Sequence, residues 1–319
     1  MISRRRLVFS TSAGVASHAL SARVFAQAPF PARPVHLVVP FAVGGPLDYI
    51  ARLIASRMAL EPAAQPWVVE NVVGASGRLA TRSVARAPRD GYRLLMADLG
   101  SLVTQSILGG SDEVQPLTDL TPVAGVGSVP FILVARRGLP VASLADVVEA
   151  ARRTKAGLTF GSSGPTSVSA LLMQALGRHF NIELVHVPFA GNSPVVLELA
   201  AERIDLAFLI ANILGTHGFH HIAITSEHEV AQWPRVAPLP PLLGQRSDFR
   251  MVNALLAPRD TPADAVNALA SLARRALTAP QVIDDLARRG FEVDYQPPAG
   301  LNRTLSLLNA AWSAILRKI

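Results

Sequence analysis

The segment VVPFAVGGPLDYIAR, residues 38–52, joins a mostly apolar run to an amphipathic one through a glycine pair. Residues 35–39 are rich in valine, which is typical of a buried strand. Beyond Gly44 and Gly45, apolar residues recur with helical spacing from residue 50 to residue 58. The segment therefore predicts a strand, a glycine turn and the start of a helix in immediate succession.

The start of this helix has the chemistry of an anion site. Pro46 suits the first helical position, because the N–H that proline lacks would have no partner there. Asp48 falls in the first turn, where a carboxylate complements the helix dipole. Gly44 and Gly45 carry no side chains that would cover the backbone N–H groups at this positive helix end. An ordinary strand-to-helix turn fits the same pattern, and geometry alone leaves both interpretations open.

Strand-like and helix-like segments alternate along the chain, which predicts an α/β fold. The expected strands are residues 35–39, 67–70, 92–97, 159–161, 184–187, 206–209 and 222–225. The expected helices are residues 48–60, 144–155, 168–180, 261–277, 281–289 and 301–316. Ser143 and Asp146 have the spacing of a capping box at the start of the second of these helices.

Four turns rich in glycine or hydroxyl groups follow expected strands, at residues 40–48, 71–77, 98–101 and 161–167. In open α/β sheets, ligands bind beyond the carboxyl ends of the strands, where such turns collect. Backbone N–H groups and hydroxyls at helix starts can hold a carboxylate without a paired arginine. Of Ser162, Ser163, Thr166 and Ser167, we expect at least one only to cap the following helix.

Five motifs occur in one order between about Pro34 and Trp312, and together they carry a resemblance. They are Val39-Pro-Phe-x-x-Gly-Gly-x-x-Asp-x-x-Ala-Arg52, Val68-Val-Glu-Asn-x-x-Gly-Ala-x-Gly77, Asp90-Gly-Tyr-x-Leu-Leu-Met96, Val187-Pro-Phe-x-Gly191 and Leu256-Ala-Pro-x-x-Thr-Pro262. The ordered set resembles the solute receptors of tripartite tricarboxylate transporters, the TctC or Bug family. The resemblance covers nearly the whole chain after the N-terminal segment.

The resemblance implies a two-lobed periplasmic binding protein of type II-like architecture, with a ligand cleft between the lobes. Lobe one would comprise residues 27–128 plus 227–319, and lobe two residues 129–226. The proline-rich stretch 233–241 would be an extended, exposed connection that follows the second return between lobes. This discontinuous arrangement comes from the family and not from periodicity.

The resemblance also implies a set of ligand-binding residues on these turns. They are Phe41, Gly44, Gly45, Asp48, Gly74, Gly77, Ser101, Ser162, Ser163, Thr166, Phe189 and Asn192. Three replacements relative to the family pattern remove polar groups: Phe189 replaces a tyrosine, Leu47 a small polar residue, and Ala170 a histidine. In the run Phe208-Leu-Ile-Ala-Asn212, Leu209 departs from the family's usual Phe-Asp-Asn order. The stretch that follows, up to Ile222, is several residues shorter than in the family. We expect either a more apolar ligand with fewer oxygens or a receptor that has lost binding.

Residues 1–26 have the composition of an export signal. Arg4, Arg5 and Arg6 precede a mildly apolar stretch, and Val24-Phe-Ala26 suits cleavage before Gln27. The stretch Ser3–Phe9 also approaches a twin-arginine signal, so both export routes stay open. Removing four arginines leaves 30 − 4 = 26 basic against 23 acidic residues, so the formal charge falls from +7 to +3. The high isoelectric point is therefore no argument for nucleic-acid binding. The export signal leads us to expect a periplasmic location.

The expected function is an extracytoplasmic receptor that captures a small organic carboxylate for a tripartite transporter. The expected partners are that ligand and the membrane permease, the expected state is a monomer, and no cofactor or metal is expected. A sensor that signals through a membrane partner is the alternative, and an enzyme on the same scaffold is a third. The sequence contains no cysteine and no standard catalytic motif, and Asp48, Asp98 and Asp205 are only conceivable acid–base groups. The histidines His217, His220, His221 and His228 match no standard zinc spacing.

Overall fold

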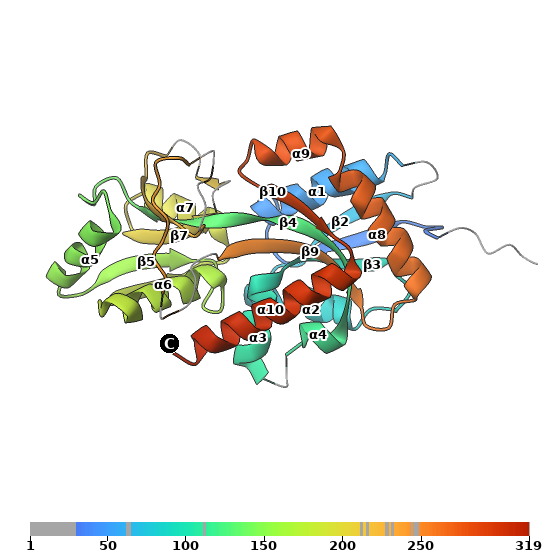
Figure 1. Cartoon of the computed structure of the whole chain (residues 1–319), viewed down its shortest axis with the longest axis horizontal. Coiled ribbons are helices and arrows are strands. Elements are labelled where there is room, and N and C mark those ends of the chain that lie inside the picture. Colours follow the sequence, from blue (N-terminus) through green and yellow to red (C-terminus); the bar gives the residue numbers. More distant parts are fainter. Residues whose placement is uncertain are drawn as a thin grey trace, which may run out of the picture.

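The computed structural model describes residues 30–61, 65–110, 113–210, 213–214, 217–226, 230, 233–242, 244 and 249–318. The expected export signal, His228 and Asn212 therefore lie outside the described residues. Within this part of the chain, strands and helices alternate in two groups joined by long strands (Figure 1). None of the described helices combines the length and the apolar character that a membrane span needs.

One sheet runs through the described part of the chain, in the order β2-β1-β3-β9-β4-β7-β5-β6, with β8 and β10 also paired to β4. The strands are β1 (Val35–Val39), β2 (Trp67–Asn71), β3 (Arg93–Asp98), β4 (Leu120–Ala135), β5 (Leu158–Ser162), β6 (Leu184–Pro188), β7 (Leu206–Ile210), β8 (His220–Ile224), β9 (Arg250–Pro258) and β10 (Glu292–Gln296). The strands β2-β1-β3 form one parallel group, and β6-β5-β7 form another. The antiparallel strands β9 and β4 lie between the two groups.

The strand β4 connects the two groups because it changes partner along its length. Leu120 to Pro130 pair with β9, and Phe131 to Ala135 pair with β7. In Figure 1, β4 and β9 run side by side from one group of elements into the other. The change of partner lies close to the predicted lobe boundary at residues 128 and 129, although the lobe division itself stays a prediction.

Helices cover both groups of strands. They are α1 (Pro46–Met58), α2 (Arg78–Ala85), α3 (Leu99–Gly109), α4 (Pro116–Asp119), α5 (Leu144–Arg153), α6 (Val168–Phe180), α7 (Asn192–Ala200), α8 (Ala263–Leu277), α9 (Pro280–Ala287) and α10 (Pro298–Leu316). The helices α5, α6 and α7 lie with β5 to β7, and the others lie with β1 to β3 (Figure 1). The helix α1 turns an apolar face to the sheet, since Ile50, Ile54 and Met58 are completely buried and α1 contacts β1, β2 and β3. Burying one such side chain contributes about 1.5–3 kcal/mol.

The local predictions agree with the structure. Each of the seven expected strands lies on β1, β2, β3, β5, β6, β7 or β8, and α6 begins and ends at the expected residues. The capping box at Ser143 is present, with reciprocal hydrogen bonds between the side chains and backbone N–H groups of Ser143 and Asp146.

The prediction of secondary structure was incomplete for β4, β9 and β10 and for the helices α2, α3, α4 and α7. Proline and glycine at Pro122, Gly125, Gly127 and Pro130 interrupt the strand pattern of β4 in the sequence. The structure accommodates part of this interruption by register shifts between Pro122 and Ala124 and between Gly125 and Gly127. Long-range pairing with β9 therefore overrides the local turn signals.

Candidate functional site

The loop between β1 and α1 is held in shape by Asp48. This carboxylate is 2% exposed, and it accepts hydrogen bonds from the backbone N–H of Gly44, from Asn71 Nδ2 and from Arg52 Nε, at 2.8–2.9 Å. Gly44 has φ +79°, a left-handed conformation in which glycine is favoured. Asp48 thus folds the glycine loop back onto its own helix, which is a positioning role.

The pKa of Asp48 reflects the same contacts. Burial alone would raise the pKa, but the hydrogen bonds from Arg52, Gly44 and Asn71 outweigh it and hold the pKa below its usual value. Asp48 therefore stays ionised at neutral pH, and it keeps the loop closed over the start of α1.

The turn after β2 approaches the opposite half of the molecule. Gly74 and Gly77 have φ of +142° and +95°. Ser76 lies so close to Gly164 that a Cβ added to Gly164 would come within 2.4 Å of Ser76 Oγ. Thr104 Oγ1 donates to the carbonyl of Thr166 at 2.9 Å nearby. The turns that follow β2 and β5 are therefore in contact.

Asp98 ends β3 and caps α3. Its Oδ1 accepts from the N–H of Gly100 at 3.2 Å, and its Oδ2 accepts from Ser101 Oγ at 2.5 Å. The side chain is 8% exposed. Burial raises the pKa of Asp98 to about 6, against the lowering effect of the hydrogen bonds from Ser101 and Gly100.

The hydroxyl groups of the turn between β5 and α6 have different roles. Ser162 Oγ donates to the carbonyl of Gly164 and lies 2.6 Å from His186 Nε2. Ser167 caps α6 by accepting from the N–H of Ala170, as expected of at least one of the four hydroxyl residues, and its Oγ lies 3.1 Å from Ser169 Oγ. Thr166 Oγ1 is buried without a hydrogen-bond partner in the described protein.

The turn between β6 and α7 brings the start of another helix to the same place. Phe189 is held by a hydrogen bond from its N–H to the carbonyl of Ser162, at 2.9 Å. Gly191 precedes α7 with φ +139°. Within the described chain, no side chain caps α7 or α1, so the amide groups of their first turns are left to other acceptors.

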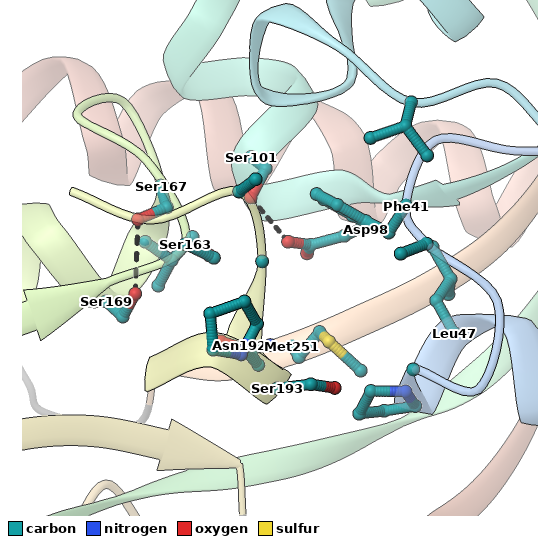
Figure 2. Close-up of a pocket in the computed structure, with 18 of the residues that line it drawn as sticks. Phe41, Leu47, Asp98, Ser101, Ser163, Ser167, Ser169, Asn192, Ser193 and Met251 are labelled. Atoms are coloured by element: carbon teal, nitrogen blue, oxygen red, sulfur yellow. Dashed lines mark hydrogen bonds between the residues drawn. The ribbon is translucent and has the colours of Figure 1, made fainter. Parts of the chain in front are cut away.

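A cavity of about 240 Å³ lies where these turns meet (Figure 2). The described residues that line it are Phe41, Ala42, Gly45, Pro46, Leu47, Val73, Asp98, Ser101, Phe131, Ser163, Ser167, Val168, Ser169, Ala190, Gly191, Asn192, Ser193, Pro194 and Met251. Among them, Asp98 is the only one with an ionisable side chain. The helices α1, α3, α6 and α7 all begin at this cavity.

The cavity contains part of the predicted set. Phe41, Gly45, Ser101, Ser163 and Asn192 line it. Gly77 lines a small adjoining cavity, together with Phe41, Asp98 and Ser101. The remaining residues, Gly44, Asp48, Gly74, Ser162, Thr166 and Phe189, do not line either space in the described structure, although they shape the turns that do.

Besides Phe189, two further family departures are located away from the cavity, and one lines it. Leu47 lines the cavity and is 3% exposed. Ala170 is buried in α6, and Leu209 lies in β7 opposite Ile132, so neither lines it. Of these three departures, only Leu47 adds apolar surface to the wall of the cavity itself.

Sequence reasoning missed the floor of the cavity and its one charge. Phe131 and Met251 belong to β4 and β9, which were not expected as strands. Asp98 was placed in the candidate turn 98–101 and noted as a conceivable acid–base group, but it was not among the predicted ligand-binding residues. An acidic residue directly after the buried run Leu94–Ala97 was the signal that could have singled it out.

The histidine cluster lies on β8 and just before it. His220 Nε2 lies 3.0 Å from the carbonyl of Arg137, and His221 packs edge-on against Trp233. Within the described residues, no group of three or more His, Asp or Glu side chains is arranged to hold a metal ion.

Comparison with known proteins identifies the family of this chain. A model described as the tripartite tricarboxylate transporter family receptor matches residues 50–319. A relative from Agrobacterium vitis, described as a UPF0065 protein, is 33% identical over 87% of this chain and 82% of its own length. The chain belongs to the tripartite tricarboxylate transporter receptor family.

Solved structures agree with this family. A protein of R. palustris solved with adipate is 28% identical, with a TM-score of 0.84, and the match covers 91% of this chain and 98% of that one. MatC from Rhodopseudomonas palustris, solved with bound malate, is 29% identical with a TM-score of 0.83, over 90% of this chain and 99% of that one. The chain therefore has the fold of the periplasmic solute-binding receptors of this family.

Proposed function

We propose that this receptor binds a small organic carboxylate in the 240 Å³ cavity and delivers it to the membrane permease of a tripartite transporter. It would act in the periplasm as a monomer, after residues 1–26 are removed, and release its ligand chemically unchanged. The lobes, residues 27–128 plus 227–319 and residues 129–226, would close on the ligand. Relatives at 28% and 29% identity that were solved with adipate and malate support the ligand class.

The observation that carries this proposal is the pair of uncapped helix starts at the cavity. The first turns of α1 and α7 expose N–H groups that have no acceptor within their own helix, and Leu47, Asn192 and Ser193 of these turns line the cavity. Both helix dipoles favour an anion there. No cationic side chain lines the cavity among the described residues, so backbone groups would hold the carboxylate.

The position of these two helices explains how binding could drive closure. The helix α1 follows β1 in one group of strands, and α7 follows β6 in the other. A carboxylate that accepts from both helix starts gains its full set of contacts only when they are close together. Such a ligand would shift an open–closed equilibrium towards the closed form.

The test is calorimetric titration of the purified protein with mono-, di- and tricarboxylates, followed by recovery of the acid. Binding of at least one acid, recovered unchanged, is expected. Gly45→Leu should weaken that binding at least tenfold, because Gly45 lines the cavity at the start of α1. Gly300→Leu is the matched control, since Gly300 also lies near the start of a helix but does not line the cavity, and a Cβ there would have its nearest neighbour at 3.5 Å. No binding by any acid, or conversion of the bound acid, would refute the proposal.

A further inference from the structure

The cavity has one corner that can only accept hydrogen bonds. Ser101 Oγ donates its proton to Asp98 Oδ2, and the N–H of Gly100 donates to Asp98 Oδ1. The donors of this corner are therefore already used. The backbone N–H of Ser101 also donates to Asp98, so these three contacts occupy three of the about four acceptor sites of an ionised carboxylate. Asp98 and the Ser101 oxygen therefore keep acceptor capacity towards the cavity that both line.

The acceptor corner and the donor groups lie on different sides of the cavity. In the view of Figure 2, Asp98 and Ser101 lie above it, and Asn192 and Ser193 at the start of α7 lie below. Among the described residues that line this cavity and the small one beside it, Asp98 is the only titratable group. The cavity is thus polarised, with backbone donors on one side and a buried carboxylate on the other.

We propose that the ligand is a small acid that presents a hydrogen-bond donor, an ammonium rather than a hydroxyl group, to Asp98 and Ser101. This inference rests on the proposed function, because it assumes that the carboxylate of the ligand lies at α1 and α7. A second carboxylate facing Asp98 would place two like charges in a site where Asp98 is only 8% exposed, and its oxygens would find no donor in that corner. An ammonium group fits the charge and supplies the missing protons.

The size of the cavity limits the ligand to a short molecule. Its 240 Å³ is below the roughly 300–1,000 Å³ of pockets that hold drug-sized ligands. Phe41, Leu47, Phe131 and Met251 add apolar walls between the two polar sides. A chain of a few methylene groups with a carboxylate at one end and an ammonium at the other matches this arrangement.

The test compares probes of equal length that differ only at the second end. The protein is titrated with straight-chain four- to six-carbon amino acids, hydroxy acids, monocarboxylates and dicarboxylates that carry their second group at the chain end. In the wild type, the amino acid should bind at least tenfold tighter than the dicarboxylate of the same length, with the hydroxy acid between them.

The variant Asp98→Asn keeps an acceptor for Gly100 and removes the charge. It should weaken amino-acid binding at least tenfold and strengthen dicarboxylate binding. Asp264→Asn is the matched control, because Asp264 is an exposed carboxylate in the first turn of α8 that does not line the cavity, and it should change neither affinity.

The outcomes separate the two proposals. A dicarboxylate that binds as tightly as the amino acid, with a ratio that Asp98→Asn leaves unchanged, would overturn this inference and leave the carboxylate receptor intact. Failure of every acid to bind would overturn both. Tight binding of the amino acid with the reversed selectivity in Asp98→Asn would support it.

Discussion

Replacing Asp48 by alanine tests whether this carboxylate builds the loop that leads into α1. Asp48 accepts from Gly44 N–H, Asn71 Nδ2 and Arg52 Nε, and hydrogen bonds to a charged group contribute about 1.5–3 kcal/mol each. The Arg52 contact contributes less than about 0.5 kcal/mol, because the guanidinium is 47% exposed. Gly44 is exposed, so water can replace part of its lost bond. We therefore expect Asp48→Ala to lose about 2–3 kcal/mol of unfolding free energy.

Urea unfolding measures this loss, and ligand titration measures its effect on the cavity. Since Gly45 and Leu47 line the cavity, a displaced loop should also weaken ligand binding at least tenfold. Arg52→Ala is the matched control and should cost less than about 1 kcal/mol. The reasoning is refuted if Asp48→Ala unfolds within 1 kcal/mol of the wild type, or if Arg52→Ala costs as much as Asp48→Ala.

The same pair of proteins has a defined pH dependence. The folded pKa of Asp48 lies below its unfolded value of about 3.9. Its ionised contacts therefore stabilise the protein above the unfolded pKa, and this contribution is lost as pH falls through the folded pKa. The gap between the wild type and Asp48→Ala should be constant from pH 5 to pH 8 and narrow below pH 4.

Three further changes have expected outcomes. Burial raises the folded pKa of Asp98 to about 6, so the stability associated with its protonated form is lost as pH rises through 6. In urea unfolding, Asp98→Asn should therefore be more stable than the wild type by up to about 3 kcal/mol at pH 8. Below pH 4 the two proteins should be nearly equal in stability. Gly164→Ala should lose about 1–3 kcal/mol of unfolding free energy and bind ligand more weakly, because φ is +129° and a Cβ would lie 2.4 Å from Ser76 Oγ. The loss should be smaller in a Ser76→Gly background. An equal loss in that background would contradict the contact. Gly45→Ala should keep the fold, since its φ of −73° suits any residue and the Cβ would meet only the carbonyl oxygen of Ala42, at 3.2 Å. Its ligand affinity should lie between those of the wild type and Gly45→Leu in calorimetry.

Local patterns predicted the parts of the site that local physics determines. The turn from β1 to α1 is encoded by adjacent residues, since Gly44, Pro46 and Asp48 each have a conformational or electrostatic preference for their position. The expected start of α6 followed from hydroxyl residues before an apolar helical run, and Ser167 does cap it. Such signals require no knowledge of the rest of the chain.

The parts that were missed depend on distant segments. The wall residues Phe131 and Met251 belong to β4 and β9, which pair with one another, and the sequence of β4 is interrupted by proline and glycine. Gly125 and Gly127 indicate turns when considered alone, yet both pair with β10 on one edge of β4 and with β9 on the other. The role of Asp98 as a hydrogen-bond acceptor was missed, because it depends on the burial of this side chain and on the donor groups at the opposite side of the cavity. Neither can be derived from the sequence.

The pairing of β3 with β9 has a consequence for the time course of synthesis. Ala97 and Asn253, which contact each other across these strands, are 156 residues apart in the chain. At a synthesis rate of about 5–20 residues per second, roughly 8–30 s separate the appearance of the two partners. During that interval β1, β2 and β3 lack the neighbour that closes their sheet. Until β9 has been made, this sheet therefore cannot close, and for those seconds β1, β2 and β3 remain accessible to chaperones.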